Sequence, residues 1–311
     1  MIALVLFGFS CTKPNSDRTD TKPADEKTDD EGDGGEETPE PTKPEVKTCA
    51  ENLVLHLSFD SDAIVEKGEG VTLAENKGQV ELAKGFIGKA WNNKGGDNTV
   101  EAYSKLALAS GNAVTALESF TFSCWAKLPK DKEAKSGIIS FNGTGVEAIW
   151  PSFVFIFDNV SDVTPEEGAP FQAQQFNGRI DFLTVEGKPA LWPNCASDIF
   201  LLKDTWFQMA RTYDAATGHW ANYANGLLVN EGDFTPNDQP GGPVKAAFAE
   251  DCNALYVGGW ASRIEGKASD AWQAYCPGSL DELRFYNKAL SGDEINALYK
   301  EELNINLDQE E

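Results

Sequence analysis

The stretch that decides the fold reads Trp206-Phe-Gln-Met-Ala-Arg-Thr-Tyr-Asp-Ala-Ala-Thr-Gly-His-Trp-Ala-Asn-Tyr-Ala-Asn-Gly-Leu-Leu-Val229. It predicts two alternating strands joined by a turn at residues 214–218. A second tight turn is expected at Asn225-Gly226, because two-residue hairpin turns favour the Asn-Gly pair. The segment therefore indicates a run of antiparallel hairpins.

A second informative segment is Pro277-Gly-Ser-Leu-Asp-Glu-Leu-Arg-Phe-Tyr-Asn-Lys-Ala-Leu-Ser291. It predicts a strand that is followed by the start of a helix. Ser291 and Glu294 have the spacing of a capping box, in which the hydroxyl and the carboxylate satisfy free backbone amides reciprocally. The apolar positions that follow, Ile295, Leu298 and Tyr299, suit one face of a helix.

These two segments resemble the laminin-G-like branch of the concanavalin-A-like lectin/glucanase superfamily. The resemblance rests on Trp206, Tyr213-Asp214 and Asn225-Gly226, and on the strand that starts at Gly278. It implies an all-β fold, an antiparallel two-sheet jelly-roll sandwich with a short C-terminal helix. Arg211 and Asn222 depart from the family's apolar pattern. They either line a polar groove or show that the strand parity is off by one residue.

Alternation elsewhere in the chain agrees with this fold. Leu53, Leu55, Leu57 and Phe59 fall on one face of an expected first strand, while His56 and Ser58 fall on the other. Further strands are expected at 119–128, 137–142, 152–158, 179–185, 254–259 and 279–286, punctuated by Gly, Pro and Asn. The sequence predicts one jelly-roll domain over residues 49–303, no internal repeat, and a flexible acidic tail over 304–311.

The N-terminal region predicts export and tethering. Residues 1–11 are apolar but shorter than the roughly 20 residues that span a bilayer, so they fit a signal peptide. Ser10-Cys11 resembles the lipobox of bacterial lipoproteins, which makes Cys11 the predicted lipidation site; the alternative is an ordinary secretory peptide. Residues 12–48 are rich in Asp, Glu, Lys, Thr and Pro, which predicts a disordered acidic tether. The expected location is the bacterial outer membrane or cell surface, with lipid as the membrane link.

The charge composition narrows the classes of partner that the chain is expected to bind. The chain has 26 Lys and Arg against 50 Asp and Glu, a net charge of −24. Such a chain repels phosphate backbones, so nucleic-acid binding is not expected.

The cysteines leave a choice of pairings. Cys124 shares a strand face with Phe120 and Phe122 and is expected to be a buried free thiol. Four others, Cys49, Cys195, Cys252 and Cys276, allow three connectivities or a reduced state. By resemblance to laminin-G-like modules, Cys252 and Cys276 are the favoured pair.

The strand at 279–286 also raises the question of a metal. Asp281 shares strand parity with Leu283 and Phe285, so its carboxylate faces the core and needs a partner. In relatives of this superfamily a calcium ion lies between the first and last strands, and Asp60, Asp62 and Asp281 could supply its oxygen ligands. The alternative is a structural carboxylate that accepts hydrogen bonds from backbone amides.

Enzyme chemistry has little support in the sequence. His56 and His219 are the only histidines, neither has metal-ligand spacing, and the paired-carboxylate motif of the superfamily's glycosidases is missing. Asp281 and Glu282 are adjacent and should point to opposite faces of a strand. No catalytic residue is therefore predicted.

Ligand binding is expected from aromatic residues in connections, because a sugar's apolar face stacks on a flat ring while its hydroxyls need planar polar partners. The candidates are Trp150, Trp192, Trp260, Arg263 and Trp272. The alternative for each tryptophan is a lid packed over the sandwich. The predicted function is non-catalytic, lectin-like binding of a glycan or polysaccharide; the alternatives are a module that binds a cell-surface protein, and a glycoside hydrolase.

Overall fold

The protein is described by a computed structural model in which Pro44–Glu311 form one compact unit. The described backbone comprises residues 44–129, 136–143, 153–163, 173–184, 189–190, 195–202, 204–233, 246–267 and 273–310. Side chains are described for these residues except 158–163, 173–184, 189–190, 195–202, 246–247 and 310. Cys11 and most of the predicted tether lie outside the described residues.

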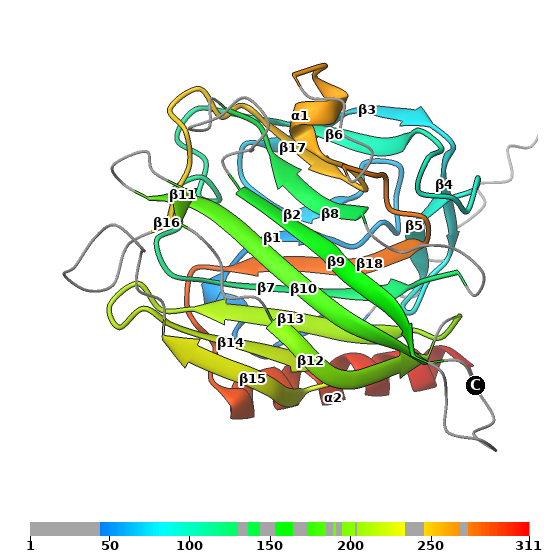
Figure 1. The fold of residues 1–311 in the computed structure, drawn as a ribbon, viewed down its shortest axis with the longest axis vertical. Helices are drawn as coiled ribbons and strands as arrows, with labels where there is room; N and C mark the ends of the chain where they lie inside the picture. Colours follow the sequence, from blue (N-terminus) through cyan, green and yellow to red (C-terminus); the bar gives the residue numbers. More distant parts are fainter. Residues whose placement is uncertain are drawn as a thin grey trace, which may run out of the picture. The chain divides into compact units, whose positions relative to one another are not determined.

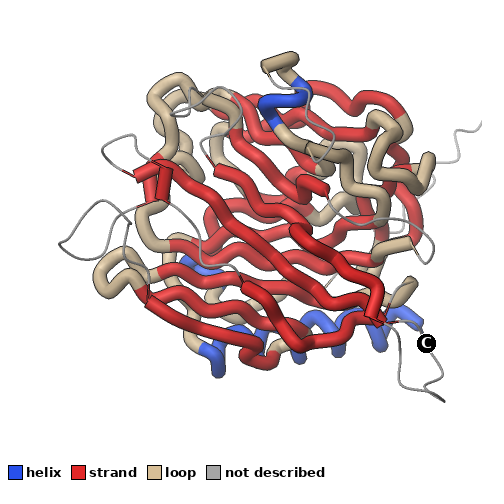
Figure 2. Tube along the Cα trace, in the orientation of Figure 1, coloured by secondary structure: helices blue, strands red, loops and turns tan. Residues whose placement is uncertain are grey.

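Within the described ranges the strands form two nine-stranded sheets (Figures 1 and 2). The first sheet has the order β15 (Leu227–Asp233), β14 (His219–Ala224), β13 (Phe207–Tyr213), β7 (Phe120–Lys127), β18 (Ser279–Tyr286), β1 (Leu53–Leu57), β2 (Val65–Lys67). Beside this path, β5 (Lys89–Asn93) pairs with β18 and with β4 (Val80–Lys84).

The second sheet has the order β11 (Pro189–Ala190), β10 (Ala173–Thr184), β9 (Phe153–Val163), β8 (Ser136–Phe141), β17 (Ala254–Val257), β6 (Ala102–Leu108), β3 (Val71–Gly78). Beside this path, β12 (Cys195–Leu202) and β16 (Ala246–Ala247) pair with β10. The helices are η1 (Ala50–Asn52), α1 (Ala261–Ile264) and α2 (Gly292–Glu310). The all-β, antiparallel sandwich expected from the sequence is confirmed, although the strands between Val65 and Leu108 were not predicted.

The core lies between the sheets. Leu55, Phe122 and Phe285 of the first sheet and Phe141 and Phe155 of the second are all buried in one cluster. Neighbouring rings meet across the two sheets, as in the pair Phe122 and Phe155, whose ring centroids are 4.6 Å apart. Alternation on each strand therefore leaves an outer face on both sheets that other elements can cover.

Helix α2 covers the outer face of the first sheet (Figure 1, red). Its capping box forms as predicted: the Ser291 amide donates to Glu294 (2.8 Å) and the Glu294 amide donates to the Ser291 hydroxyl (3.3 Å). The flexible tail expected over 304–311 is corrected, because α2 continues to Glu310 and buries Ile305 against Trp125.

The domain also begins earlier than expected. Residues 44–48, assigned from sequence to the tether, belong to the compact unit. The backbone amides of Lys47 and Thr48 both donate to the carboxylate of Glu301 on α2, at 2.9 Å each. Val46 packs against the same side of the sheet. The last helix therefore holds the segment through which the chain enters the domain.

Two β-bulges correct the parity expected from sequence. Between Leu53 and Leu55 the register of β1 with β18 shifts, so Leu53 packs beneath α2 and not in the central core. Between Asp281 and Arg284 the register of β18 with β7 shifts as well, and Glu282 adopts a positive φ of 49°. Because of the extra residue, Asp281 does not share the core face of Leu283.

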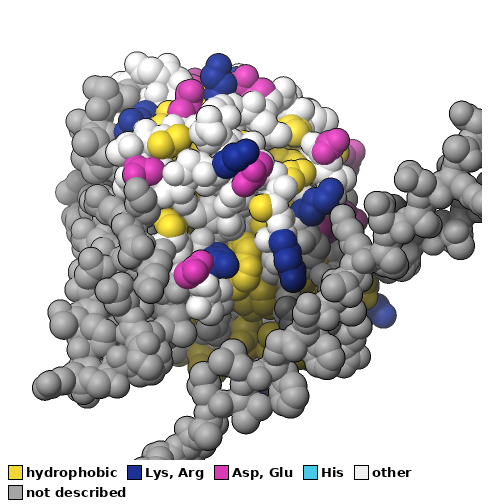
Figure 3. Space-filling view, turned by 90° about the vertical axis from the view of Figure 1, so that its right-hand side faces the viewer, with side chains coloured by type: hydrophobic (Ala, Val, Ile, Leu, Met, Phe, Trp, Pro, Cys, Tyr) yellow, Lys and Arg dark blue, Asp and Glu magenta, His cyan; other side chains and the backbone are white. Residues whose placement is uncertain are grey.

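The surface carries no strong segregation of charge on the face shown in Figure 3. Lys and Arg side chains are interspersed there with Asp and Glu, and apolar side chains show in a hollow in its lower half. No helix in the described part of the chain has the length and apolar character that a bilayer span requires.

Candidate functional site

Two of the predicted binding residues, Trp260 and Arg263, lie in the described part of the chain, and both belong to the α1 region. Trp150, Trp192 and Trp272 lie outside the described residues. The candidate site is therefore built around α1, which lies on the outer face of the second sheet, the side opposite α2.

The chain reaches this face through the Gly258-Gly259 pair that follows β17. Gly258 has a φ of +85°, and a Cβ there would lie 2.3 Å from the ring of Trp91, so this position needs glycine. Ser140 of β8 then fixes the start of α1: its hydroxyl donates to the Gly259 carbonyl and accepts from the Ala261 amide, each at 2.8 Å. The short helix is thus held directly against the sheet.

Trp260 fills space between α1 and the sheet. Its side chain is only 2% exposed and packs with Val154 and Ile156 of β9. A ring in this position has no free face for a sugar. For Trp260 the structure supports the alternative that it is a packing residue.

Arg263 is half-buried and lies against the ring of Tyr275. Its guanidinium carbon is 5.1 Å from the ring centroid of Tyr275, which is a cation–π distance, and its Nη1 donates to the Gln273 carbonyl at 3.0 Å. Gln273 is itself fully buried and donates to the Ser262 hydroxyl. The guanidinium is therefore oriented by its neighbours and not by bulk solvent.

Tyr275 is one of three tyrosines in mutual contact, which we call the tyrosine face: Tyr103 of β6, Tyr256 of β17, and Tyr275. The rings of Tyr103 and Tyr275 are nearly parallel, with centroids 6.5 Å apart, while Tyr103 and Tyr256 meet edge to face at 5.9 Å. The Lys105 ammonium lies 5.8 Å from the Tyr256 ring centroid. Tyr103 and Tyr275 are each 7% exposed, so little more than their edges reaches the surface.

The electrostatics keep all three hydroxyls protonated. Burial raises the pKa of Tyr103 and of Tyr275, and the carboxylate of Glu101 raises both further. The pKa of Tyr256 is also raised, by burial and by Glu265, which accepts a hydrogen bond from its hydroxyl at 2.9 Å. Each hydroxyl can therefore act as a donor at physiological pH.

The carboxylate of Glu265 is held in place beside the tyrosine face. Burial opposes its ionisation, but hydrogen bonds from Lys267, Asn142 and Tyr256 outweigh that effect and lower its pKa. Donors and acceptors thus alternate across a small area whose rim includes the exposed Glu75 and Glu101. This arrangement suits hydrogen bonding to a polar ligand, and it contains no nucleophile with an adjacent base.

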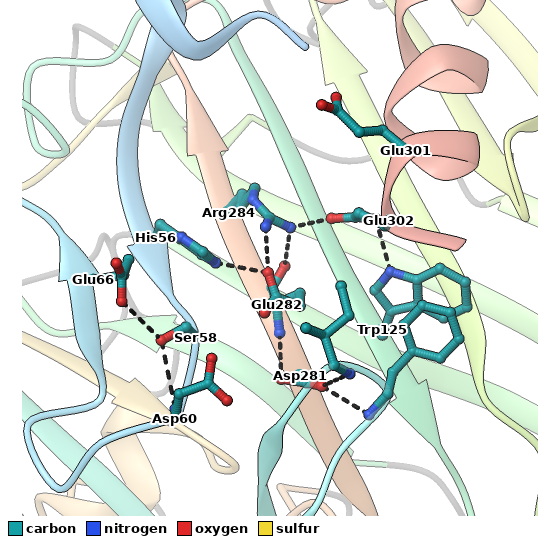
Figure 4. Close-up of polar contacts among 12 residues, drawn as sticks. His56, Ser58, Asp60, Glu66, Trp125, Asp281, Glu282, Arg284, Glu301 and Glu302 are labelled. Atoms are coloured by element: carbon teal, nitrogen blue, oxygen red, sulfur yellow. Dashed lines mark hydrogen bonds and ion pairs between the residues drawn. The ribbon is translucent and has the colours of Figure 1, made fainter. Parts of the chain in front are cut away.

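A second polar group, the buried charge cluster, lies between the first sheet and α2 (Figure 4). Arg284 of β18 forms short ion pairs with Glu282 and with Glu302 of α2. His56 of β1 lies 2.8 Å from Glu282, and Trp125 donates to Glu302 at 2.7 Å. The side chains of Glu282, Arg284 and Glu302 are at most 1% exposed, so these carboxylates cannot meet an extended glycan.

Asp281 acts as a structural carboxylate. Its Oδ2 accepts from the amides of Phe86 (2.8 Å) and Ile87 (2.9 Å), and its Oδ1 accepts from the Glu282 amide (2.8 Å). Asp60 accepts from the Lys89 amide on the same turn. These bonds hold the β4–β5 turn in place. They match the alternative given for Asp281, a structural carboxylate that accepts hydrogen bonds from backbone amides.

The predicted calcium ligands Asp60, Asp62 and Asp281 do not assemble. In the described ranges no three His, Cys, Asp or Glu residues are grouped so that they could hold a metal ion. Both oxygens of Asp281 accept hydrogen bonds from backbone amides.

The favoured disulfide between Cys252 and Cys276 is corrected. The Cys276 amide donates to the carbonyl of Gly258, just after β17, whereas Cys252 precedes that strand. Six extended residues span roughly 20 Å, while a disulfide requires Cα atoms within about 7 Å. Cys276 is a buried free thiol, and so is Cys124, as predicted.

The structure also places the two residues that depart from the family's apolar pattern. Arg211 and Asn222 are direct cross-strand neighbours on β13 and β14. Arg211 is 2% exposed, with its guanidinium 5.7 Å from the Trp220 ring, and Asn222 donates to Asn230 at 2.7 Å. Arg211 is therefore a buried residue, while Asn222 is partly exposed.

Sequence reasoning missed the tyrosine face and the buried charge cluster. Tyr103 lies on a strand that was not predicted, and Tyr256 was read only as part of a strand. Glu302 gave no signal because it ends the charged run Lys300-Glu301-Glu302, which suits an exposed helix face. The buried charge cluster forms only because β1 pairs with β18 and α2 packs against this sheet.

Comparisons with known proteins identify the family. Residues 97–296 match the sequence model of Laminin_G_3, described as the concanavalin A-like lectin/glucanases superfamily. No curated protein matches the chain.

Several solved structures are similar at low identity. Domain 4 of AbnA, a GH43 extracellular arabinanase from Geobacillus stearothermophilus solved with arabinotriose, aligns over 80% of this chain and 98% of its own, with 20% identity and a TM-score of 0.49. A SAP-like pentraxin from Limulus polyphemus aligns over 58% of this chain and 69% of its own, with 14% identity and a TM-score of 0.40. The binding domain of botulinum neurotoxin serotype D aligns over 80% and 51%, with 14% identity and a TM-score of 0.44.

Proposed function

Because the chain belongs to the concanavalin A-like lectin/glucanase superfamily, we propose that its jelly-roll domain binds a glycan through the tyrosine face without cleaving it. One observation carries the proposal. Arg263 is oriented over Tyr275 beside protonated tyrosine hydroxyls and carboxylates, which places fixed donors and acceptors at one half-buried surface. Sugar hydroxyls require both kinds of partner within a few ångströms of each other.

The position of the face in the domain supports a binding role. The tyrosine face lies outside the second sheet, while residues 44–48 dock against α2 outside the first sheet. A domain held through its N-terminal segment would therefore present the tyrosine face away from the attachment. This geometry suits a lipid-anchored, surface-displayed protein, and we include lipidation at Cys11 and display on a bacterial surface in the proposal.

The absence of cleavage is part of the proposal. A glycosidase needs two carboxyl groups about 5–10 Å apart on either side of a glycosidic bond. Glu282 and Glu302, two carboxylates that share Arg284, are buried between the first sheet and α2 and out of reach of a glycan. The carboxylates near Arg263 instead hold tyrosine hydroxyls or lie on an exposed rim.

A second candidate, a protein-binding module, is favoured by one observation. Leu227 and Leu228 on β15, at the edge of the first sheet, are 63% and 49% exposed. Exposed leucines on an edge strand can contact another polypeptide. This surface is separate from the tyrosine face, so the two candidates can be tested independently.

The test is a glycan array probed with a chain that lacks residues 1–11, in calcium and then in chelator. Arg263→Ala should weaken binding by tenfold or more, because a charge-assisted hydrogen bond contributes about 1.5–3 kcal/mol. The matched control is Lys94→Ala, which removes an exposed cation next to β5.

The outcomes separate the candidates. Binding that falls in Arg263→Ala and persists in Lys94→Ala supports the tyrosine face as the site. Binding that both variants retain would place the glycan site elsewhere and refute the tyrosine face. No binding across neutral and acidic glycans would move the function to the protein-binding candidate. Release of reducing ends from a bound glycan would establish hydrolase activity, and loss of binding in chelator would revive the calcium prediction.

A further inference from the structure

Arg263 gives the tyrosine face a cation whose donors are only partly used. Its guanidinium carries five N–H donors and no acceptor. Nη1 donates to the Gln273 carbonyl at 3.0 Å, and a hydrogen bond between Arg263 and the Tyr275 hydroxyl opposes the rise in the pKa of Tyr275. Both contacts are with uncharged groups. Arg263 can therefore donate to a ligand while these contacts keep its orientation.

Two tyrosine hydroxyls extend this group of donors. Burial and nearby carboxylates raise the pKa of Tyr103 and of Tyr275, so both hydroxyls keep their protons at neutral pH. The two rings are nearly parallel, and their centroids are 6.5 Å apart. The Tyr256 hydroxyl differs, because it already donates to a carboxylate at 2.9 Å. Arg263, Tyr103 and Tyr275 therefore form one group of donors.

Cations also accompany the other two rings of the tyrosine face. The Lys105 ammonium is 5.8 Å from the Tyr256 ring centroid. Lys77 of β3 is the cross-strand partner of Tyr103, so both side chains lie on the same side of the sheet. The chain has 50 acidic and only 26 basic residues. Cations gathered around one small aromatic surface of such a chain therefore indicate a ligand that carries negative charge.

Two exposed carboxylates limit how much negative charge the ligand can carry. Glu75 is the cross-strand partner of Lys105. Glu101 lies close enough to raise the pKa of both Tyr103 and Tyr275. Water and salt screen such exposed charges, with a Debye length of about 8 Å at physiological ionic strength, whereas a half-buried guanidinium is screened less. One carboxylate in direct contact with the guanidinium is therefore favoured, while a polymer with many charges is repelled by the rim and by the net charge of −24.

We propose that the tyrosine face preferentially binds a glycan that ends in a sugar acid with a single carboxylate, such as a uronic acid. This inference rests on the proposed function, because it names the class of glycan for the same site. The planar carboxylate fits the fork of the Arg263 guanidinium, which can donate two parallel hydrogen bonds to it. The hydroxyls of Tyr103 and Tyr275 donate to the same sugar, and Glu101 accepts from one of its hydroxyls.

The test compares each sugar acid with its own neutral form. The panel contains oligosaccharides that end in glucuronic, galacturonic or sialic acid, each beside its methyl ester, together with neutral glycans. Dissociation constants are measured for the same protein as in the glycan array. At least one free acid should bind about tenfold or more tightly than its ester, since an ionised acceptor forms the stronger hydrogen bond. This comparison uses the parent chain, so it does not depend on how any variant folds.

Arg263→Gln and Lys94→Gln form the matched pair of variants. Each removes one positive charge and leaves an amide in its place, but Lys94 follows β5 of the first sheet and pairs with Glu81. In Arg263→Gln, binding of the free acid should weaken about tenfold or more, whereas binding of the ester should change by about twofold or less. The preference for the acid then disappears. Lys94→Gln should keep the preference of the parent.

The results separate this inference from the proposed function. Equal binding of acids and esters, weakened in Arg263→Gln, would overturn the inference and leave glycan binding at the tyrosine face intact. A preference for the acid that Arg263→Gln retains would also overturn the inference. A heparin fragment, which carries many sulfates, should bind more weakly than the sugar acid, and tighter binding would refute recognition of a single carboxylate. No binding to any acid, ester or neutral glycan would overturn both the inference and the proposed function.

Discussion

Replacing Arg284 by methionine would remove the only guanidinium in the buried charge cluster while keeping much of the side-chain volume. Arg284 is 1% exposed and pairs with Glu282 and Glu302, whose side chains are 0% and 1% exposed. Removing one partner of a buried ion pair costs about 3–5 kcal/mol because the remaining charge is uncompensated. We expect Arg284→Met to lower the free energy of unfolding by this amount at pH 7.

The assay is denaturant-induced unfolding followed by tryptophan fluorescence, with a thermal melt alongside. For a domain of this size a change of 1 kcal/mol moves the melting temperature by about 2–4 °C, so a decrease of roughly 6–20 °C is expected. The matched control is Lys288→Met, which breaks an exposed pair with Glu294. Exposed pairs contribute about 0–1 kcal/mol, so this variant should melt close to the parent.

A compensating variant separates charge from packing. In Arg284→Met combined with Glu282→Gln and Glu302→Gln, no unpaired carboxylate remains, and most of the lost stability should return. If Arg284→Met unfolds within about 1 kcal/mol of the parent, or if the triple variant is as unstable as the single one, the reasoning from buried charge is refuted.

Three further variants or conditions test other parts of the structure. Gly226→Ala should destabilise the domain by at least about 1–3 kcal/mol in the same unfolding assay, because φ is +74° and the new Cβ would lie 2.9 Å from Tyr299; an unchanged midpoint would exclude this turn geometry. Asp281→Asn should cost about 2–3 kcal/mol, since one of its oxygens would no longer accept amides, and an isosteric variant of parental stability would show that the charge is dispensable. Tyr256 should stay protonated above pH 10, because burial and Glu265 raise its pKa. Any stability linked to this proton is complete below about pH 10 and is lost as the pH rises through the raised pKa. A Tyr256 hydroxyl that titrates at the free-tyrosine midpoint in the folded protein, followed by ultraviolet absorbance, would contradict the burial.

Much of the fold could be predicted because it follows from local signals. The turn at Asn225-Gly226 and the capping box at Ser291 depend on residues that are neighbours in sequence, and both form as expected. Strand faces were also readable where alternation is unbroken, as in Phe120 and Phe122 of β7.

The predicted alternation of side chains between the two faces of a strand is wrong where one extra residue is inserted into the strand. The positive φ of Glu282 has no sequence signature, since glutamate rarely adopts it and only the surrounding structure can impose it. Once the bulge is present, Asp281 turns from the expected core face to the β4–β5 turn. The disulfide prediction failed for a related reason: resemblance supplied Cys252 and Cys276, but only three-dimensional register decides which residues meet.

The pairing of β1 with β18 has a consequence for how this chain becomes folded. Leu57 pairs with Leu283, and the helix that seals the same sheet ends at Glu310, so contacts of very large sequence separation complete the first sheet. Such contacts form late and slow the search for the native state. During synthesis, residues emerging before 279 lack the central strand between β1 and β7, and so cannot close this sheet. A nascent chain thus remains incompletely folded for most of its synthesis.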